Sequence, residues 1–176
     1  LGTPRLDLYH ASIFQMAFSM REIQKIPVSW GRSEASLLKK MTSMAELNEL
    51  TPTLHHLAEG KGFYKVTGSD PFLTYDLSSL HISGRNAGLL RFEFNCFRMR
   101  SAVKIRVSWS GANENKANNF SSLLFTAENG ALIIPLDSYP LWLARKEIGK
   151  INIKLEDSKS CSSFDLKNMK LMQRVF

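Results

Sequence analysis

Aromatic and amide side chains in the connecting segments are of the types that sugar recognition requires. Aromatic rings stack on the apolar faces of pyranose rings, and short polar side chains bind the hydroxyl groups. In "DSYPLWLARK" (137–146), Tyr139 and Trp142 flank Pro140, which stiffens the segment. This segment is the preferred aromatic platform, and a plug over the core is the alternative. The other candidate glycan ligands are Tyr75 and, in the loop "GANENKANN" (111–119), Asn113 and Asn115.

A second group of candidate residues is basic and would bind anions. Residues 1–60 carry 6 Lys+Arg and 6 Asp+Glu, so the whole net charge of +7 belongs to residues 61–176. Arginine can bind a carboxylate or phosphate with two hydrogen bonds. If the two strands that meet near residues 99–102 pair, their outward basic side chains share one face; the alternative is an ordinary solvated face. The residues of this predicted anionic-partner face are Arg91, Arg98, Arg100, Lys104 and Arg106.

Residues for catalysis or for a metal are scarce. The chain has four histidines, no nucleophile motif and no phosphate-binding loop, so we expect no catalysis within it and no cofactor. Asp70, in "TGSDPFLTYDL" (67–77), is expected to cap a turn that begins a strand. A structural calcium site at Asp70 is the weaker alternative, because calcium takes six to eight oxygen ligands.

The two cysteines are too few for a disulfide scaffold. Cys96 lies within the apolar run "FEFNCF", which predicts a buried free thiol. A bridge between Cys96 and Cys161 is the alternative in an oxidising compartment.

The elements that would position these residues divide the chain into two parts. In residues 1–60 apolar residues recur at three- and four-residue steps, beginning with residues 6–23, as on one face of a helix. Ser33 can cap a second helix that runs through residue 45, and Thr51 can begin a short third helix that ends at Gly60. We therefore predict an N-terminal helical extension over residues 1–60.

In residues 61–176 the apolar period changes to two. The segments "LLRFEFNCF", "VKIRVSW" and "INIKL" alternate apolar and polar residues, as half-buried antiparallel strands do. The last strand changes phase, which predicts a bulge near Lys167-Asn168, and "ENG" (128–130) is typical of a hairpin turn. About eight such strands predict a mainly β domain, an antiparallel β-sandwich.

The strand segments together resemble a known family. "FYKVTGSDPFLTYDL", "LLRFEFNCF", "VKIRVSWS", "ALIIPLD", "INIKLED" and "FDLKNMKLMQR" are similar to the galactose-binding-like jelly roll. The likeness is greatest to accessory modules attached to bacterial glycosyltransferases and other envelope-polysaccharide proteins, and it covers residues 62–175. The sequence departs from the pattern at "WLARKEIGKINIKL", where the family often has Arg, an acidic residue and Pro. The resemblance implies a jelly-roll fold and recognition of polysaccharide.

We therefore expect a non-catalytic carbohydrate-recognition module of a bacterial cell-envelope polysaccharide protein. Its expected partners are a polysaccharide or glycan, an anionic membrane surface, or a catalytic domain of the same parent chain. Nucleic acid is disfavoured, since the strands show no outward aromatic–basic interleaving. One alternative is a protein-interaction or membrane-proximal scaffolding domain that uses the helices and the basic face. Another is a fragment of a hydrolase or transferase whose catalytic residues lie elsewhere, because the first residue is Leu and the chain reads as a piece of a larger protein.

Overall fold

The fold is an antiparallel β-sandwich. The computed structural model describes residues 41–99, 101–114 and 121–174. Sheet A contains β1 (Met41–Glu46), β3 (Leu57–Glu59), β4 (Tyr64–Val66), β6 (Leu89–Cys96), β9 (Gly130–Pro135) and β11 (Ser163–Arg174). Sheet B contains β2 (Thr53–His55), β5 (Phe72–Asp76), β7 (Val103–Gly111), β8 (Ser121–Ala127) and β10 (Ile148–Leu155).

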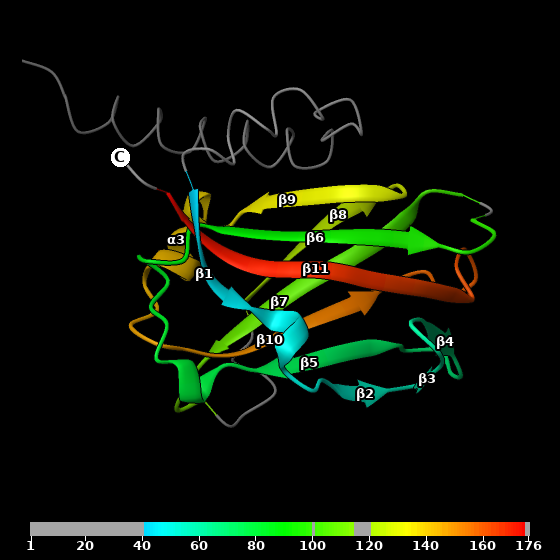
Figure 1. The fold of residues 1–176 in the computed structure, drawn as a ribbon, viewed down its shortest axis with the longest axis horizontal. Helices are drawn as coiled ribbons and strands as arrows, with labels where there is room; N and C mark the ends of the chain where they lie inside the picture. Colours follow the sequence, from blue (N-terminus) through cyan, green and yellow to red (C-terminus); the bar gives the residue numbers. More distant parts are fainter. Residues whose placement is uncertain (1–40, 100, 115–120, 175–176) are drawn as a thin grey trace, which may run out of the picture.

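The strand order is that of a jelly roll. Sheet A runs β3-β4-β11-β6-β9, with β1 also paired to β11, and sheet B runs β2-β5-β10-β7-β8. From β4 onward the chain crosses to the other sheet at every connection except the one between β7 and β8. Figure 1 shows the strands of sheet A crossing in front of β7 and β8. The predicted antiparallel sandwich and its jelly-roll architecture are therefore confirmed.

The core lies between the sheets and follows the predicted alternation of the strands. Phe92 and Phe94 of β6 face Val107 and Trp109 of β7 across the same apolar cluster, and each side chain is at most 1% exposed. Short elements close the ends of the sandwich: η2 (Leu47–Glu49), η3 (Ser78–Leu80), η5 (Leu136–Ser138) and α3 (Pro140–Leu143). Within the described ranges, no helix is long and apolar enough to cross a membrane.

Residues 41–60 form three strands of the sandwich and the short 3-10 helix η2, and no α-helix. β1 pairs with the last strand, Glu46 opposite Lys170, and β2 pairs with β5, Leu54 opposite Leu73. The helix predicted from Thr51 to Gly60 is wrong, because His56 takes a left-handed backbone (φ 49°) that separates β2 from β3. The sandwich accordingly begins before residue 61. Pairing at the open sheet edges outweighs the local capping signal, and the rest of the predicted extension lies outside the described residues.

The connection "ENG" is a crossing between sheets and not a hairpin. It joins β8 of sheet B to β9 of sheet A, and these two strands do not pair. Asn129 binds the end of β6 instead, since the Cys96 N–H donates to its Oδ1 (2.7 Å) and its Nδ2 donates to the Cys96 carbonyl (3.3 Å). The Asn-Gly pair therefore correctly indicates a change of chain direction, but the two strands that it joins lie in different sheets.

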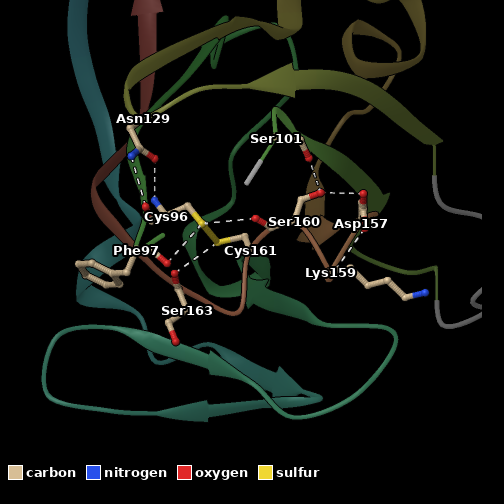
Figure 2. The surroundings of a disulfide bond; sticks show 9 residues. All are labelled: Cys96, Phe97, Ser101, Asn129, Asp157, Lys159, Ser160, Cys161 and Ser163. Atoms are coloured by element: carbon tan, nitrogen blue, oxygen red, sulfur yellow. Dashed lines mark hydrogen bonds between the residues drawn. A yellow bond between two sulfur atoms is a disulfide. The ribbon is translucent and has the colours of Figure 1, made fainter. Parts of the chain in front are cut away.

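The prediction of a free Cys96 thiol is also wrong. Cys96 and Cys161 form a disulfide, with their Cα atoms 5.9 Å apart and a sequence separation of 65. The bond joins the end of β6 to the segment that enters β11 (Figure 2). The two strands pair side by side, Phe164 opposite Cys96, which brings the cysteines together. Sequence spacing alone could not show this proximity.

The predicted bulge in the last strand is confirmed. The pairing of β11 with β6 shifts register between Lys167 and Lys170, and Asn168 adopts φ 50°. At this point the Met169 N–H leaves the ladder and donates to Asn48 Oδ1 (3.1 Å). The edge of β11 is thus divided between β4 at one end and β1 at the other.

Candidate functional site

The structure places the predicted aromatic platform in the core. Trp142, on α3, is fully buried, and its Nε1–H donates to the Ala87 carbonyl (2.7 Å). Its ring packs edge to face on Trp109, with centroids 5.5 Å apart. Trp142 is therefore the plug over the core that was the alternative, and no glycan can stack on it in this conformation. Tyr139 is half-buried beside Trp109 (centroids 6.3 Å apart), and burial raises its pKa to about 12.

The other predicted glycan ligands are scattered. Tyr75 is 3% exposed and faces the core, where burial and the neighbouring Tyr64 hydroxyl raise the pKa of its phenol. It lines a cleft of about 320 Å³, together with Tyr64 of β4 and the segment that joins η2 to β2. Asn113 is exposed in the turn after β7, and Asn115 lies outside the described residues. These residues do not form one site.

The predicted anionic-partner face does not exist as one surface. β6 belongs to sheet A and β7 to sheet B, so their outward side chains point to opposite sides of the sandwich. Arg91 therefore lies on sheet A near Glu93 (3.4 Å), whereas Lys104 and Arg106 lie on sheet B. Arg98 is exposed after the end of β6, and Arg100 lies outside the described residues. In this fold most consecutive strands lie in opposite sheets, as β6 and β7 do, which explains the error.

Asp70 has the predicted turn position directly before β5. Its carboxylate forms an ion pair with Lys154 (Nζ–Oδ1, 2.7 Å), which holds the pKa of Asp70 below its usual range. In the part of the chain that the structure describes, no group of His, Cys, Asp and Glu side chains could hold a metal ion. The lysine thus supplies the positive charge that a calcium ion would have supplied.

The outer face of sheet B carries neutral polar side chains in register. Asn152 of β10 lies opposite Thr74 of β5 on one side and Ser108 of β7 on the other. Thr53 lies opposite Thr74, and Ser122 lies opposite Ser108. We call these five residues the polar row. Since strands lie about 4.8 Å apart, the row runs for roughly 19 Å across the sheet, which suits an extended polymer.

The centre of the polar row has an acceptor without a partner. Asn152 Oδ1 is buried, and within the described residues it has no hydrogen-bond partner. The same is true of the Ser110 hydroxyl, one outward position further along β7. Buried polar atoms are nearly always hydrogen-bonded, to water or ligand if not to protein. The middle of the face therefore holds an unused acceptor and an unused hydroxyl group just below its surface.

An aromatic and charged row borders the polar row. Its members, in the same strand order, are His55, Phe72, Lys154, Arg106 and Leu124. The His55 and Phe72 rings stack with centroids 4.5 Å apart and planes at 25°. Arg106 pairs with Glu156 and donates to Ser122 Oγ (3.2 Å), while Lys154 binds Asp70. Both cations of this row have carboxylate partners, so the row does not present uncompensated positive charge.

The polar row was not predicted as a site, although part of its signal was visible. Alternation placed Asn152 and Ser108 outward, because the side-chain period of a strand is local. Their meeting with Thr74 depends on the order β5-β10-β7, which no local pattern specifies. The arrangement offers hydroxyl, amide and aromatic contacts on a rigid sheet.

No protein-family model matches this sequence, and no curated protein matches it either. Among solved structures, PfGH50B is similar with a TM-score of 0.46 and 11% identity, over 73% of this chain and 23% of that chain. A mutant family 29 carbohydrate-binding module has a TM-score of 0.47 and 11% identity, over 77% and 92% of the two chains. The family 11 carbohydrate-binding module from Clostridium thermocellum, in complex with a mixed-linked tetrasaccharide, has a TM-score of 0.45 and 16% identity, over 77% and 90%. Likeness at this level assigns neither a family nor a ligand to this chain.

Proposed function

We propose that this domain binds polysaccharide, without catalysis, along the polar row of sheet B. The observation that carries the proposal is the unpaired Asn152 Oδ1 at the centre of a row of hydroxyl side chains. Once the Asn152 amide turns toward solvent, a sugar hydroxyl can donate to this oxygen and accept from a neighbouring serine or threonine. The Phe72 ring, half-buried beside the row, supplies an apolar surface for a pyranose face.

The charges of the face favour a neutral polysaccharide. An acidic polymer would need free cations, but Lys154 and Arg106 already have Asp70 and Glu156 as partners. Breaking such a pair to bind another carboxylate exchanges one ionic contact for a similar one. Binding along the polar row is therefore expected to persist at high salt, because exposed charge pairs are screened by salt and neutral hydrogen bonds are not.

A binding panel with two variants tests this proposal. The purified domain is titrated with neutral glucans, xylans and mannans, and with an acidic polygalacturonate, at low and high salt. Asn152→Ala and Phe72→Ala each remove a contact of about 0.5–1.5 kcal/mol, so the double variant is expected to bind roughly 5- to 150-fold more weakly. Lys65→Ala, on β4 of sheet A, is the control and should bind as the wild type does. Failure of every neutral polymer to bind would refute the proposal.

We also propose that the domain works in an oxidising compartment, such as the bacterial cell envelope. The support is the Cys96–Cys161 disulfide, since such bonds persist in oxidising compartments and are rare in the cytosol. The sequence resemblance of residues 62–175 supports a role as an accessory module beside a glycosyltransferase-type catalytic domain. Alkylation of thiols in intact cells tests the compartment. We expect both cysteines to remain unmodified until the disulfide is reduced, and alkylation without reduction would contradict the proposed compartment.

A further inference from the structure

We propose that a second site, in the cleft beside the disulfide, binds an oxyanion group such as a carboxylate, sulfate or phosphate. The cleft has a volume of about 400 Å³, within the range of ligand sites. Its lining consists of two cations, three serines and one methionine: Arg98, Lys159, Ser158, Ser160, Ser162 and Met99. This site is separate from the polar row, and its existence does not depend on the proposed function.

The two walls of the cleft are joined covalently. Arg98 and Met99 follow Cys96 at the end of β6, and the serines and Lys159 flank Cys161 before β11. The Cys96–Cys161 bond therefore holds both walls at a fixed separation (Figure 2). A prearranged site loses less side-chain and loop entropy on binding than a loose one.

Hydrogen bonds fix the serine wall further. Ser160 Oγ donates to Asp157 Oδ2 (2.7 Å) and lies 2.7 Å from Ser101 Oγ, while the Lys159 N–H donates to Asp157 Oδ1 (3.2 Å). These contacts occupy the Asp157 carboxylate, and their hydrogen bonds lower its pKa. Asp157 does not line the cleft, and its carboxylate instead fixes the turn through these hydrogen bonds. Figure 2 shows the Lys159 side chain extending away from this turn.

The cations of the cleft differ from the two cations that lie beside the polar row. Lys154 and Arg106 have carboxylate partners, whereas Arg98 and Lys159 form no ion pair within the described ranges. Arg98 is also held in the left-handed region (φ 68°), which is unfavourable for a residue with a long side chain. Such backbone outliers concentrate at binding sites. The two cations, which form no ion pair in the described part of the chain, and the hydroxyl groups of Ser158 and Ser162 together supply the donors that an oxyanion requires. The Ser160 hydroxyl already donates to Asp157.

The test is titration of the disulfide-bonded domain with two probes, inorganic sulfate and an oligogalacturonate, followed by backbone amide NMR. Shifts confined to residues 158–162 and Arg98 are expected. In Arg98→Asn/Lys159→Gln the affinity is expected to fall at least tenfold; asparagine is chosen because it tolerates the left-handed backbone. Lys65→Gln/Lys104→Gln removes the same charge from exposed strand positions and should leave the affinity unchanged within twofold.

The two probes distinguish the sources of the oxyanion. Binding of sulfate would identify a free-anion site, and binding of the oligogalacturonate alone would identify a site for acidic saccharides; both outcomes support the proposal. Absence of binding by both probes would overturn it. Equal loss of affinity in the two double variants would overturn it as well, because the effect would then be one of net charge. Neutral polysaccharide binding, measured on the same variants, reports on the polar row independently.

Discussion

The indole rings of Trp109 and Trp142 meet edge to face, with centroids 5.5 Å apart and planes at 82°. Trp109 comes from β7 of sheet B, and Trp142 comes from the short helix α3 that closes one end of the sandwich. Both are at most 1% exposed. The pair therefore anchors the connection between β9 and β10 to the core, and Trp142 is a stability residue.

Trp142→Ala is expected to lower the free energy of unfolding by about 3–5 kcal/mol, because it leaves a large cavity. Trp142→Phe keeps much of the volume but leaves the Ala87 carbonyl unpaired, which costs about 1–3 kcal/mol. Urea denaturation measures both values. Leu141→Ala, at the neighbouring position, is the matched control. The Leu141 side chain is 62% exposed, so its loss should change stability little. If Trp142→Ala were as stable as the wild type but had lost polysaccharide binding, Trp142 would be a glycan-binding residue and not a stability residue.

The faces of the strands could be predicted from sequence, but their neighbours could not. The inward direction of Trp109 and the outward direction of Asn152 follow from the alternation of side chains, which is a property of each strand alone. Arg91 and Arg106 were expected on one surface because their strands are consecutive, yet the crossover between β6 and β7 places them on opposite sheets. The polar row also depends on the strand order. Its members come from five strands that are neighbours in the sheet, of which only β7 and β8 are consecutive in the chain. Site prediction failed where it needed the strand order.

Local signals also failed at the sheet edges. Thr51, Pro52 and Gly60 are correct residues for the ends of a helix, but the segment between Thr51 and Gly60 is only eight residues long. A helix of that length is marginal in isolation. Pairing with β5 gives the backbone of β2 hydrogen bonds and places Leu54 against the core. Tertiary contacts therefore determined the structure of this segment.

Asn129→Ala is expected to destabilise the crossing between β8 and β9. The variant removes both side-chain bonds to the backbone of Cys96 and leaves its N–H without an acceptor, at a cost of about 1–3 kcal/mol. Thermal unfolding and amide hydrogen exchange at Cys96 measure the change. Glu128→Gln, the adjacent exposed residue, is the control. Unchanged exchange at Cys96 would show that this contact is not formed in solution.

Asp76 is expected to make stability depend on pH. Its carboxylate accepts from the Ser78 N–H (3.0 Å), which is the main cause that lowers the pKa of Asp76 below the ordinary 3.8. Because the folded-state pKa is depressed, this contribution is fully present above the unfolded-state pKa and is lost as the pH falls through the folded-state value. Asp76→Asn should therefore show a smaller loss of stability than the wild type between about pH 5 and pH 2. Parallel curves for the two proteins, measured by urea unfolding at each pH, would contradict the assignment.

Reduction of the disulfide is expected to destabilise the domain without changing its fold. The bond closes a loop of 65 residues, and the loss of such a crosslink costs about 2–5 kcal/mol. Cys96→Ser/Cys161→Ser should show this loss in urea unfolding and should not respond to dithiothreitol, whereas the wild type should fall to the same stability once reduced. The far-UV circular dichroism of the variant should remain that of a β protein. The pairing of β6 with β11 spans seven residue pairs, which do not need the disulfide. An identical urea midpoint for oxidised and reduced wild type would mean that the pairing of β6 with β11 alone holds this end of the sandwich together.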